Sequence, residues 1–288
     1  MRMPLHWTVL LLGALTVAPF AAEAALRLYV SYVAKREPLF RSDAQTGWRN
    51  APNLLTTLIN AAGEEWSIRT DQNGQRLIAQ DDPGARRRIL ILGDSLSFGE
   101  GIDIKDRFDV KMLSFLPGAR VINTGTMGYG TDQEYVAFRN WKHLLGPGDT
   151  VLILLNQSDY FDVLRRRVVG RAKPYFEKFH GSFVLRTPSI GLLERWSDWS
   201  LVARVAARFF NRSSSDQASE SLDPSQSIEI ISFILDRIRE EAPSGVRVVL
   251  AHQGTRDFLG PKLSLSSTIF CQFADVCIDL DDVLADPV

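Results

Sequence analysis

The chain has 288 residues, of which 45% are apolar and 23% are charged, and its formal net charge is −1. This balance is that of an ordinary globular protein and excludes a mainly disordered chain. The nearly neutral charge gives no electrostatic basis for binding nucleic acid. The length predicts one domain of about 200 to 250 residues with appendages.

Residues 1–36 are the first distinct segment. No Asp, Glu, Lys or Arg occurs from Met3 to Ala22, a stretch close to the ~20 residues that a membrane span needs. A cleavable secretory signal would end near this point. The apolar pattern instead continues past Glu23 to Val30, which favours a retained anchor. Basic residues flank the segment on both sides and do not fix its orientation. We expect an anchor helix that binds the membrane, with the main domain periplasmic or otherwise extracytoplasmic.

Residues 37–88 form a polar lead-in that we expect to pack on the main domain, with a turn at Asn73-Gly74. In residues 89–288, short apolar runs alternate with helix-like stretches, which predicts βαβ units and a parallel sheet. The expected strands are Ile89–Leu92, Ala119–Ile122, Thr150–Leu155, Val246–Ala251 and Val276–Leu280. The expected helices are Asp106–Leu116, Asp132–Leu145 and Ser227–Glu241.

Residues 161–226 interrupt this alternation. They contain Arg165-Arg166-Arg167, an amphipathic run over Leu192–Phe210, and a polar stretch over Asn211–Ser227 that predicts a surface loop. We expect an insertion over the carboxyl edge of the sheet, serving as a lid or as a surface for protein partners. The arginines either contact an anionic substrate or lipid head groups, or form a solvated face.

The first expected strand ends at Leu92 and is followed by Gly93-Asp94-Ser95. A serine on a tight turn at the carboxyl edge of an α/β sheet lies where ligands bind. A helix that begins near Ser95 leaves free N–H groups beside the hydroxyl, able to hold an oxyanion. The same residues also fit a plain turn in which Asp94 or Ser95 caps the next helix.

Two further strand ends carry similar signals. Asn123–Gln133 has three glycines in six residues, which let backbone approach a ligand closely, although a glycine-rich loop without chemistry fits as well. After the third strand come Asn156, Ser158 and Asp159. Together these blocks resemble the SGNH, or GDSL, hydrolases. The resemblance implies a flavodoxin-like three-layer α/β sandwich with a mainly parallel five-stranded sheet. It also implies a serine esterase of membrane-anchored bacterial type.

The resemblance assigns roles to individual residues. Ser95 corresponds to the nucleophile and to the first oxyanion donor, while Gly128 matches the second donor better than Gly125 does. The third block departs from the family pattern, because Ser158 stands where the family has its oxyanion asparagine, and Asn156 fits only after a shift of two residues. Asp159 matches the family. We expect Asp94 to fix the turn.

The last block of the family, Asp-x-x-His, is absent from this sequence. Among the four histidines, His252 alone follows a predicted strand at the carboxyl edge, which makes it the candidate base, with Asp257 or Asp279 to orient it. A structural histidine is the alternative. A histidine from a partner chain, or from the lost end of a truncated product, would also supply a base.

Two functions follow from these observations. The first is an ester hydrolase or acyl transferase acting on an acylated cell-envelope carbohydrate or lipid, a substrate class that only the resemblance implies. The second is a catalytically impaired SGNH-like pseudoenzyme that serves as a membrane-anchored subunit. No ligand cluster with usable spacing is visible, so we expect no metal and no organic cofactor. Cys271 and Cys277 fit either a disulfide or two buried thiols.

Overall fold

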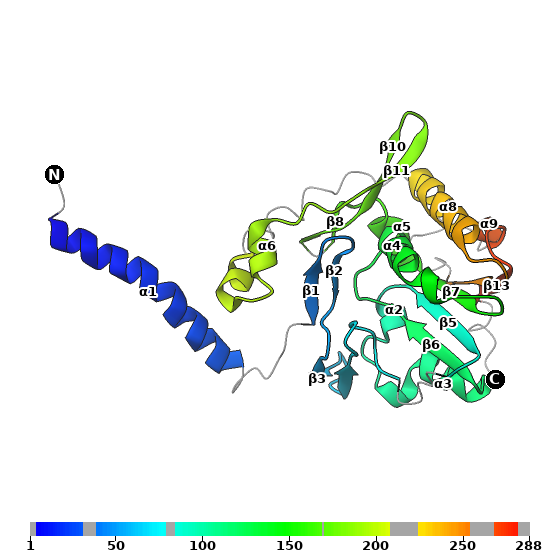
Figure 1. Cartoon of the computed structure of the whole chain (residues 1–288), viewed down its shortest axis with the longest axis horizontal. Coiled ribbons are helices and arrows are strands. Elements are labelled where there is room, and N and C mark those ends of the chain that lie inside the picture. Colours follow the sequence, from blue (N-terminus) through cyan, green and yellow to red (C-terminus); the bar gives the residue numbers. More distant parts are fainter. Residues whose placement is uncertain are drawn as a thin grey trace.

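The computed structural model describes residues 4–30, 39–78, 84–168, 170–207, 224–253 and 268–281. A five-stranded sheet in the order β13-β12-β7-β5-β6, with every neighbouring pair parallel, forms its centre (Figure 1). The bounds are Arg87–Leu92 (β5), Ala119–Asn123 (β6), Thr150–Leu155 (β7), Arg247–His252 (β12) and Val276–Asp279 (β13). All five predicted strands are therefore present, in the flavodoxin-like order, and the strand order reverses between β5 and β7.

Helices cover both faces of this sheet. One face packs against α4 (Thr131–Trp141) and α8 (Pro224–Glu241) through a cluster that includes Leu90, Ile153 and Leu250. The other face carries α3 (Phe108–Phe115), whose Leu113 packs on Ile91 and Val121. Short 3₁₀ turns flank these helices at Ile104–Asp106 (η2) and Lys142–Leu144 (η3). The three predicted helices are thus present, because their apolar residues recur at the helical period.

The lead-in folds as two antiparallel hairpins. These pair β1 (Phe40–Asp43) with β2 (Gly47–Asn50) and β3 (Leu55–Ile59) with β4 (Glu65–Arg69). The predicted turn at Asn73-Gly74 is present, with the Gly74 N–H donating to the Asp71 carbonyl at 3.1 Å. Trp48 on β2 is 2% exposed because it packs on Tyr129 and Val168, which joins the lead-in to the main domain.

The insertion contains two further hairpins and two short helices. The strands are β8 (Arg167–Val168), β9 (Arg171–Ala172), β10 (Tyr175–Phe179) and β11 (Ser182–Arg186). The predicted amphipathic run splits into α6 (Leu192–Trp196) and helical residues 201–207, because the Ser200 hydroxyl accepts from the Ala203 N–H and starts a new helix. Of the predicted polar loop, residues 211–223 lie outside the described part of the chain, and residues 224–227 belong to α8.

The arginine run of the insertion is engaged within the molecule. Arg165 pairs with Asp162 at 3.0 Å, Arg166 with Glu177 at 3.5 Å and Arg167 with Glu194 at 3.6 Å. These contacts favour the solvated-face interpretation over a site for an anion.

The amino-terminal segment forms α1 (Leu5–Tyr29), which projects from the body (Figure 1). Of the helices in the described ranges, none has the length and apolar character that crossing a membrane requires.

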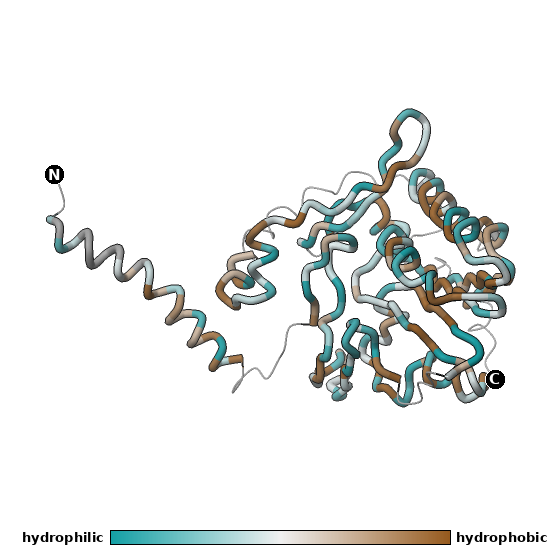
Figure 2. The backbone as a smooth tube through the Cα atoms, viewed as in Figure 1, coloured by the Kyte–Doolittle hydropathy of each residue, from teal (hydrophilic) through white to brown (hydrophobic). Residues whose placement is uncertain are grey.

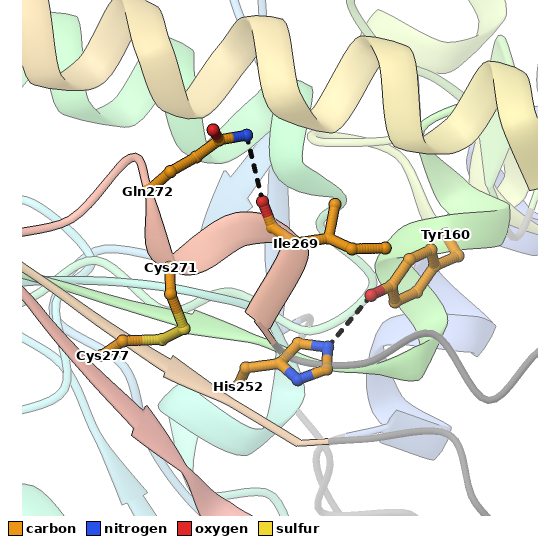
Figure 3. Close-up of a disulfide and its surroundings, with 6 residues drawn as sticks. All are labelled: Tyr160, His252, Ile269, Cys271, Gln272 and Cys277. Atoms are coloured by element: carbon orange, nitrogen blue, oxygen red, sulfur yellow. Dashed lines mark hydrogen bonds between the residues drawn. A yellow bond between two sulfur atoms is a disulfide. The ribbon is translucent and has the colours of Figure 1, made fainter.

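The two cysteines form a disulfide that joins the end of α9 (Thr268–Cys271) to β13, with 5.3 Å between the Cα atoms of Cys271 and Cys277 (Figure 3). The sequence left this pairing open, and the structure decides it in favour of the disulfide.

Reduction of this bond should destabilise the fold by about 2 kcal/mol, the loop-closure entropy of a cross-link between residues six positions apart. Urea unfolding of the oxidised chain, the reduced chain and the Cys271→Ser/Cys277→Ser variant measures this effect. The chain holds no other cysteine, so the reduced protein and the variant should agree. Equal stability of the oxidised and reduced chains would contradict the prediction.

Candidate active site

Ser95 is the first residue of α2 (Ser95–Phe98), directly beyond the carboxyl end of β5, and its side chain is partly exposed. The chain reaches this position through Gly93, whose φ of 156° disfavours other residues. A Cβ on Gly93 would lie 1.8 Å from the Ser97 Oγ, so only glycine allows the turn to close against α2.

The Asp94 carboxylate connects this turn to the end of β7. One of its oxygens accepts from the Leu96 N–H at 2.9 Å and so caps α2. Its other oxygen accepts from the Ser158 hydroxyl at 3.0 Å. Asp94 is 4% exposed, and it holds together the two loops on either side of the point where the strand order reverses.

Asn156 and Ser158 form the start of α5 (Gln157–Asp162). The Asn156 Oδ1 accepts from both the N–H and the hydroxyl of Ser158, each at 2.8 Å. A serine hydroxyl has one hydrogen, so that of Ser158 is committed either to Asn156 or to Asp94. The Asn156 Nδ2 is buried and has no hydrogen-bond partner among the described residues.

The glycine-rich loop lies against the serine turn. The Gly125 N–H donates to the Asn123 Oδ1 at 2.9 Å, and a Cβ on Gly125 would lie 2.6 Å from the Phe98 N. Gly125 therefore has a packing role. Gly128 has φ 78°, and none of the hydrogen bonds found among the described residues engages its N–H or that of Ser95.

Residues that the sequence did not single out hold this loop in place. The Asn50 Nδ2 donates to the Gly125 carbonyl at 3.0 Å, and the Trp48 Nε1 donates to the Met127 carbonyl at 3.2 Å. Both belong to the lead-in, far away in sequence, so a linear pattern offered no signal for them.

A buried polar network supports α2 from behind. The Asn123 Nδ2 donates to the Ser97 carbonyl at 2.7 Å and to Asp109 at 2.8 Å, and Asp109 in turn pairs with Arg107. Arg107 and Asp109 are 1% and 0% exposed. The strand-ending Asn123 is the one member that the sequence analysis marked.

Acidic side chains gather beneath Asp94. Asp159 is fully buried, accepting from the Asn156 N–H at 2.9 Å and the Thr131 hydroxyl at 3.2 Å. Glu134 on α4 is 1% exposed, and neither of its carboxyl oxygens has a hydrogen-bond partner in the described part of the chain. Burial, followed by the charge of Asp94, raises the pKa of Asp159 well above its usual range. Burial, followed by the charge of Asp159, does the same to the pKa of Glu134.

His252 ends β12 at the same edge, but its ring is fully buried and its Nε2 lies 3.0 Å from the Tyr160 hydroxyl (Figure 3). Phe270 packs beside it, and burial lowers the pKa of the imidazole. Within the described residues no hydrogen bond joins His252 to Ser95. Asp279 lies opposite His252 in the β12–β13 register, while Asp257 lies outside the described residues.

No protein-family model matches the chain, and neither does any curated protein. Among solved structures, the chain is similar to AlinE4, an SGNH-hydrolase family esterase, at 17% identity and a TM-score of 0.41, over 71% of this chain and 82% of that one. It is also similar to a member of the lipolytic protein G-D-S-L family from Veillonella parvula, at 11% identity and a TM-score of 0.31, over 69% and 73% of the two chains. A third is the acetyl xylan esterase Est2A from Butyrivibrio proteoclasticus, at 10% identity and a TM-score of 0.34, over 69% and 56%. AlinE4 is described as a member of the SGNH-hydrolase family and the Veillonella parvula protein as a member of the G-D-S-L family.

The raised pKa of Glu134 makes the fold sensitive to pH. The folded chain holds a proton that the unfolded chain releases, so its stability should fall as pH rises above about 4.3, the pKa of an unperturbed glutamate. We expect Glu134→Gln to flatten this slope by about 1.4 kcal/mol per pH unit and to raise stability near neutral pH.

Urea midpoints measured at a series of pH values test this expectation. Glu65→Gln, at an exposed position on β4, is the matched control and should follow the wild-type curve. Parallel curves for wild type and Glu134→Gln would show that Glu134 does not retain a proton on folding.

Proposed function

We propose that the chain is a serine ester hydrolase or acyl transferase with Ser95 as its nucleophile. The observation that supports this most directly is the position of Ser95: partly exposed, at the start of a helix, where the strand order of a parallel sheet reverses. Among the described residues no hydrogen bond engages the backbone N–H groups of Ser95 and Gly128, and we take these groups as the oxyanion donors. The geometry suits acyl transfer, in which a hydroxyl attacks a carbonyl while nearby N–H groups hold the oxyanion.

In this reaction the Ser95 Oγ bonds to the acyl carbon, and its proton passes to a base. The alcohol of the ester then leaves with a proton, and the acyl group goes on to water or to another alcohol. The N–H groups of Ser95 and Gly128 stabilise the oxyanion of each tetrahedral intermediate. We propose an acylated carbohydrate or lipid of the cell envelope as the substrate class.

We assign the third oxyanion donor to Asn156 in preference to Ser158. The only hydrogen of the Ser158 hydroxyl is already committed, whereas the Asn156 Nδ2 is the unpaired donor of the same loop. Removal of one oxyanion donor typically lowers turnover by about 10²–10³.

A specific observation favours a second function, that of an impaired SGNH-like pseudoenzyme acting as a membrane-anchored subunit. His252, the base that the sequence offers, faces Tyr160 and is shielded from solvent. A serine without an adjacent base is a weak nucleophile at neutral pH. Under this alternative, the insertion and α1 supply the surfaces for protein partners.

Labelling with a fluorophosphonate distinguishes the two functions. We expect the purified full chain to be labelled, and Ser95→Ala to lose the label while keeping the wild-type thermal melt. A folded wild-type chain that takes up no label would overturn the hydrolase and leave the pseudoenzyme.

The donor assignment is tested by comparing Asn156→Ser with Ser158→Ala in the hydrolysis of a p-nitrophenyl ester. Serine at position 156 still caps α5 but lacks the amide, so we expect kcat to fall about 10²-fold or more. Ser158→Ala should change kcat by less than about tenfold, because the only hydrogen of its hydroxyl is committed to Asp94 or Asn156. The reverse order of effects would return the role to Ser158.

A further inference from the structure

Three large apolar side chains are exposed at one corner of the insertion. Leu192, Trp196 and Trp199, here called the tryptophan corner, are 75%, 67% and 80% exposed. Tryptophan is usually highly buried in folded proteins, so two such rings in open positions within four residues require an explanation.

The corner is rigidly mounted on the lead-in. The Asp198 carboxylate accepts from the Ser42 N–H at 2.9 Å, and its carbonyl accepts from Arg41. The Ser42 hydroxyl donates to the Glu194 carbonyl at 3.2 Å. These hydrogen bonds hold the backbone of the corner against the lead-in, while the two indole rings stay exposed to solvent.

The same corner binds α1. Glu23 of α1 accepts from the N–H groups of Leu201 and Val202 at 3.1 and 3.0 Å, and Arg27 donates to the Trp199 carbonyl. Burial opposes ionisation of Glu23, but these N–H groups, with Ser200 and Arg27, lower its pKa to about 2. These contacts between α1 and the corner, here called the Glu23 joint, therefore persist at neutral pH.

The apolar surface continues from the corner onto α1, where Phe20, Leu28 and Tyr29 are 78%, 59% and 56% exposed. Figure 2 shows brown stretches on both elements, and Figure 1 places α6 beside the end of α1 that joins the body. The exposed apolar residues of α1 are not confined to one narrow stripe, a distribution that suits lipid better than a protein groove.

The acidic residues of the corner, Glu23, Glu194 and Asp198, accept hydrogen bonds from groups within the molecule. Arg27 pairs with Glu23 but is still 60% exposed on its side chain, and Arg195 is also exposed, so the accessible charge at the corner is positive. Such a surface is complementary to anionic lipid head groups.

We propose that the tryptophan corner and α1 together rest on a lipid bilayer that carries anionic head groups, with Trp196 and Trp199 at the interface. Indole rings have an apolar body and a polar N–H, and they concentrate at this level of membranes. The neighbouring arginines bind the head groups, and the Glu23 joint keeps α1 and the corner on one surface. This proposal does not depend on the activity of Ser95.

The test uses the full chain with vesicles of phosphatidylcholine, with and without phosphatidylglycerol. We expect flotation with the anionic vesicles, and quenching of tryptophan fluorescence by brominated phosphatidylcholine. Trp196→Ser/Trp199→Ser should bind at least about tenfold more weakly. Its remaining quenching should come from Trp7 on α1, which is 56% exposed. Phe115→Ser removes an 81% exposed ring on α3 and is the matched control, expected to bind like wild type.

A second variant, Arg195→Gln, changes an exposed cation outside the contacts between α1 and the corner, so it should weaken binding to anionic vesicles and leave binding to phosphatidylcholine alone unchanged. Wild-type binding and quenching by the double tryptophan variant would overturn the proposal. So would a concentration-dependent dimer in sedimentation velocity that the tryptophan variant abolishes, because the corner would then dock a second copy of the chain. Thermal melts of every variant establish that each is folded.

Discussion

The candidate site depends on the hydrogen bonds of the Asp94 carboxylate. One of its oxygens accepts from the Leu96 N–H and caps α2, and the other lies within hydrogen-bond distance of the Ser158 hydroxyl. A single side chain thus links the ends of β5 and β7. Asp94 and the Asn156 Oδ1 both lie within hydrogen-bond distance of the Ser158 hydroxyl, whose single hydrogen is therefore committed within the loop.

The helices α2, α4 and α5 begin at this edge of the sheet, and the positive ends of their dipoles stabilise the ionised form of carboxyl groups buried there. Asp159 lies in the first turn of α5, while Asp132 and Glu134 lie in the first turn of α4. Carboxylates are stabilised at helix amino termini. Burial still raises the pKa of Asp132 to about 6, even with Lys173 paired to it. Burial therefore outweighs the helix termini, and the carboxyl groups behind the serine turn have pKa values above their usual range.

The sheet was predictable because each strand is a short apolar run between turn signals, and Gly93-Asp94-Ser95 marked the site because its glycine and serine are local requirements of the turn. The Asn123–Asp109–Arg107 network was not predictable, since it joins residues whose contact depends on how α3 packs on β6. The amphipathic run that begins at Leu192 divides into two helices because Ser200 caps the second one, although the apolar pattern itself continues across this point. His252 was placed at the correct edge, but the direction of its ring depends on Tyr160, which belongs to another element.

Segments outside the sheet contribute as much to the site as the strands do. The loop that presents Gly128 is held by Asn50 and Trp48 from the lead-in, and the insertion adds Val168 to the same cluster. The lead-in is therefore part of the site, because without it the backbone of this loop would lose its outer hydrogen bonds. Holding an oxyanion and activating a serine are separate properties, and they draw on different parts of this chain. The proposed oxyanion donors lie on loops that distant residues hold in place, whereas His252, the candidate base, is hydrogen-bonded to Tyr160.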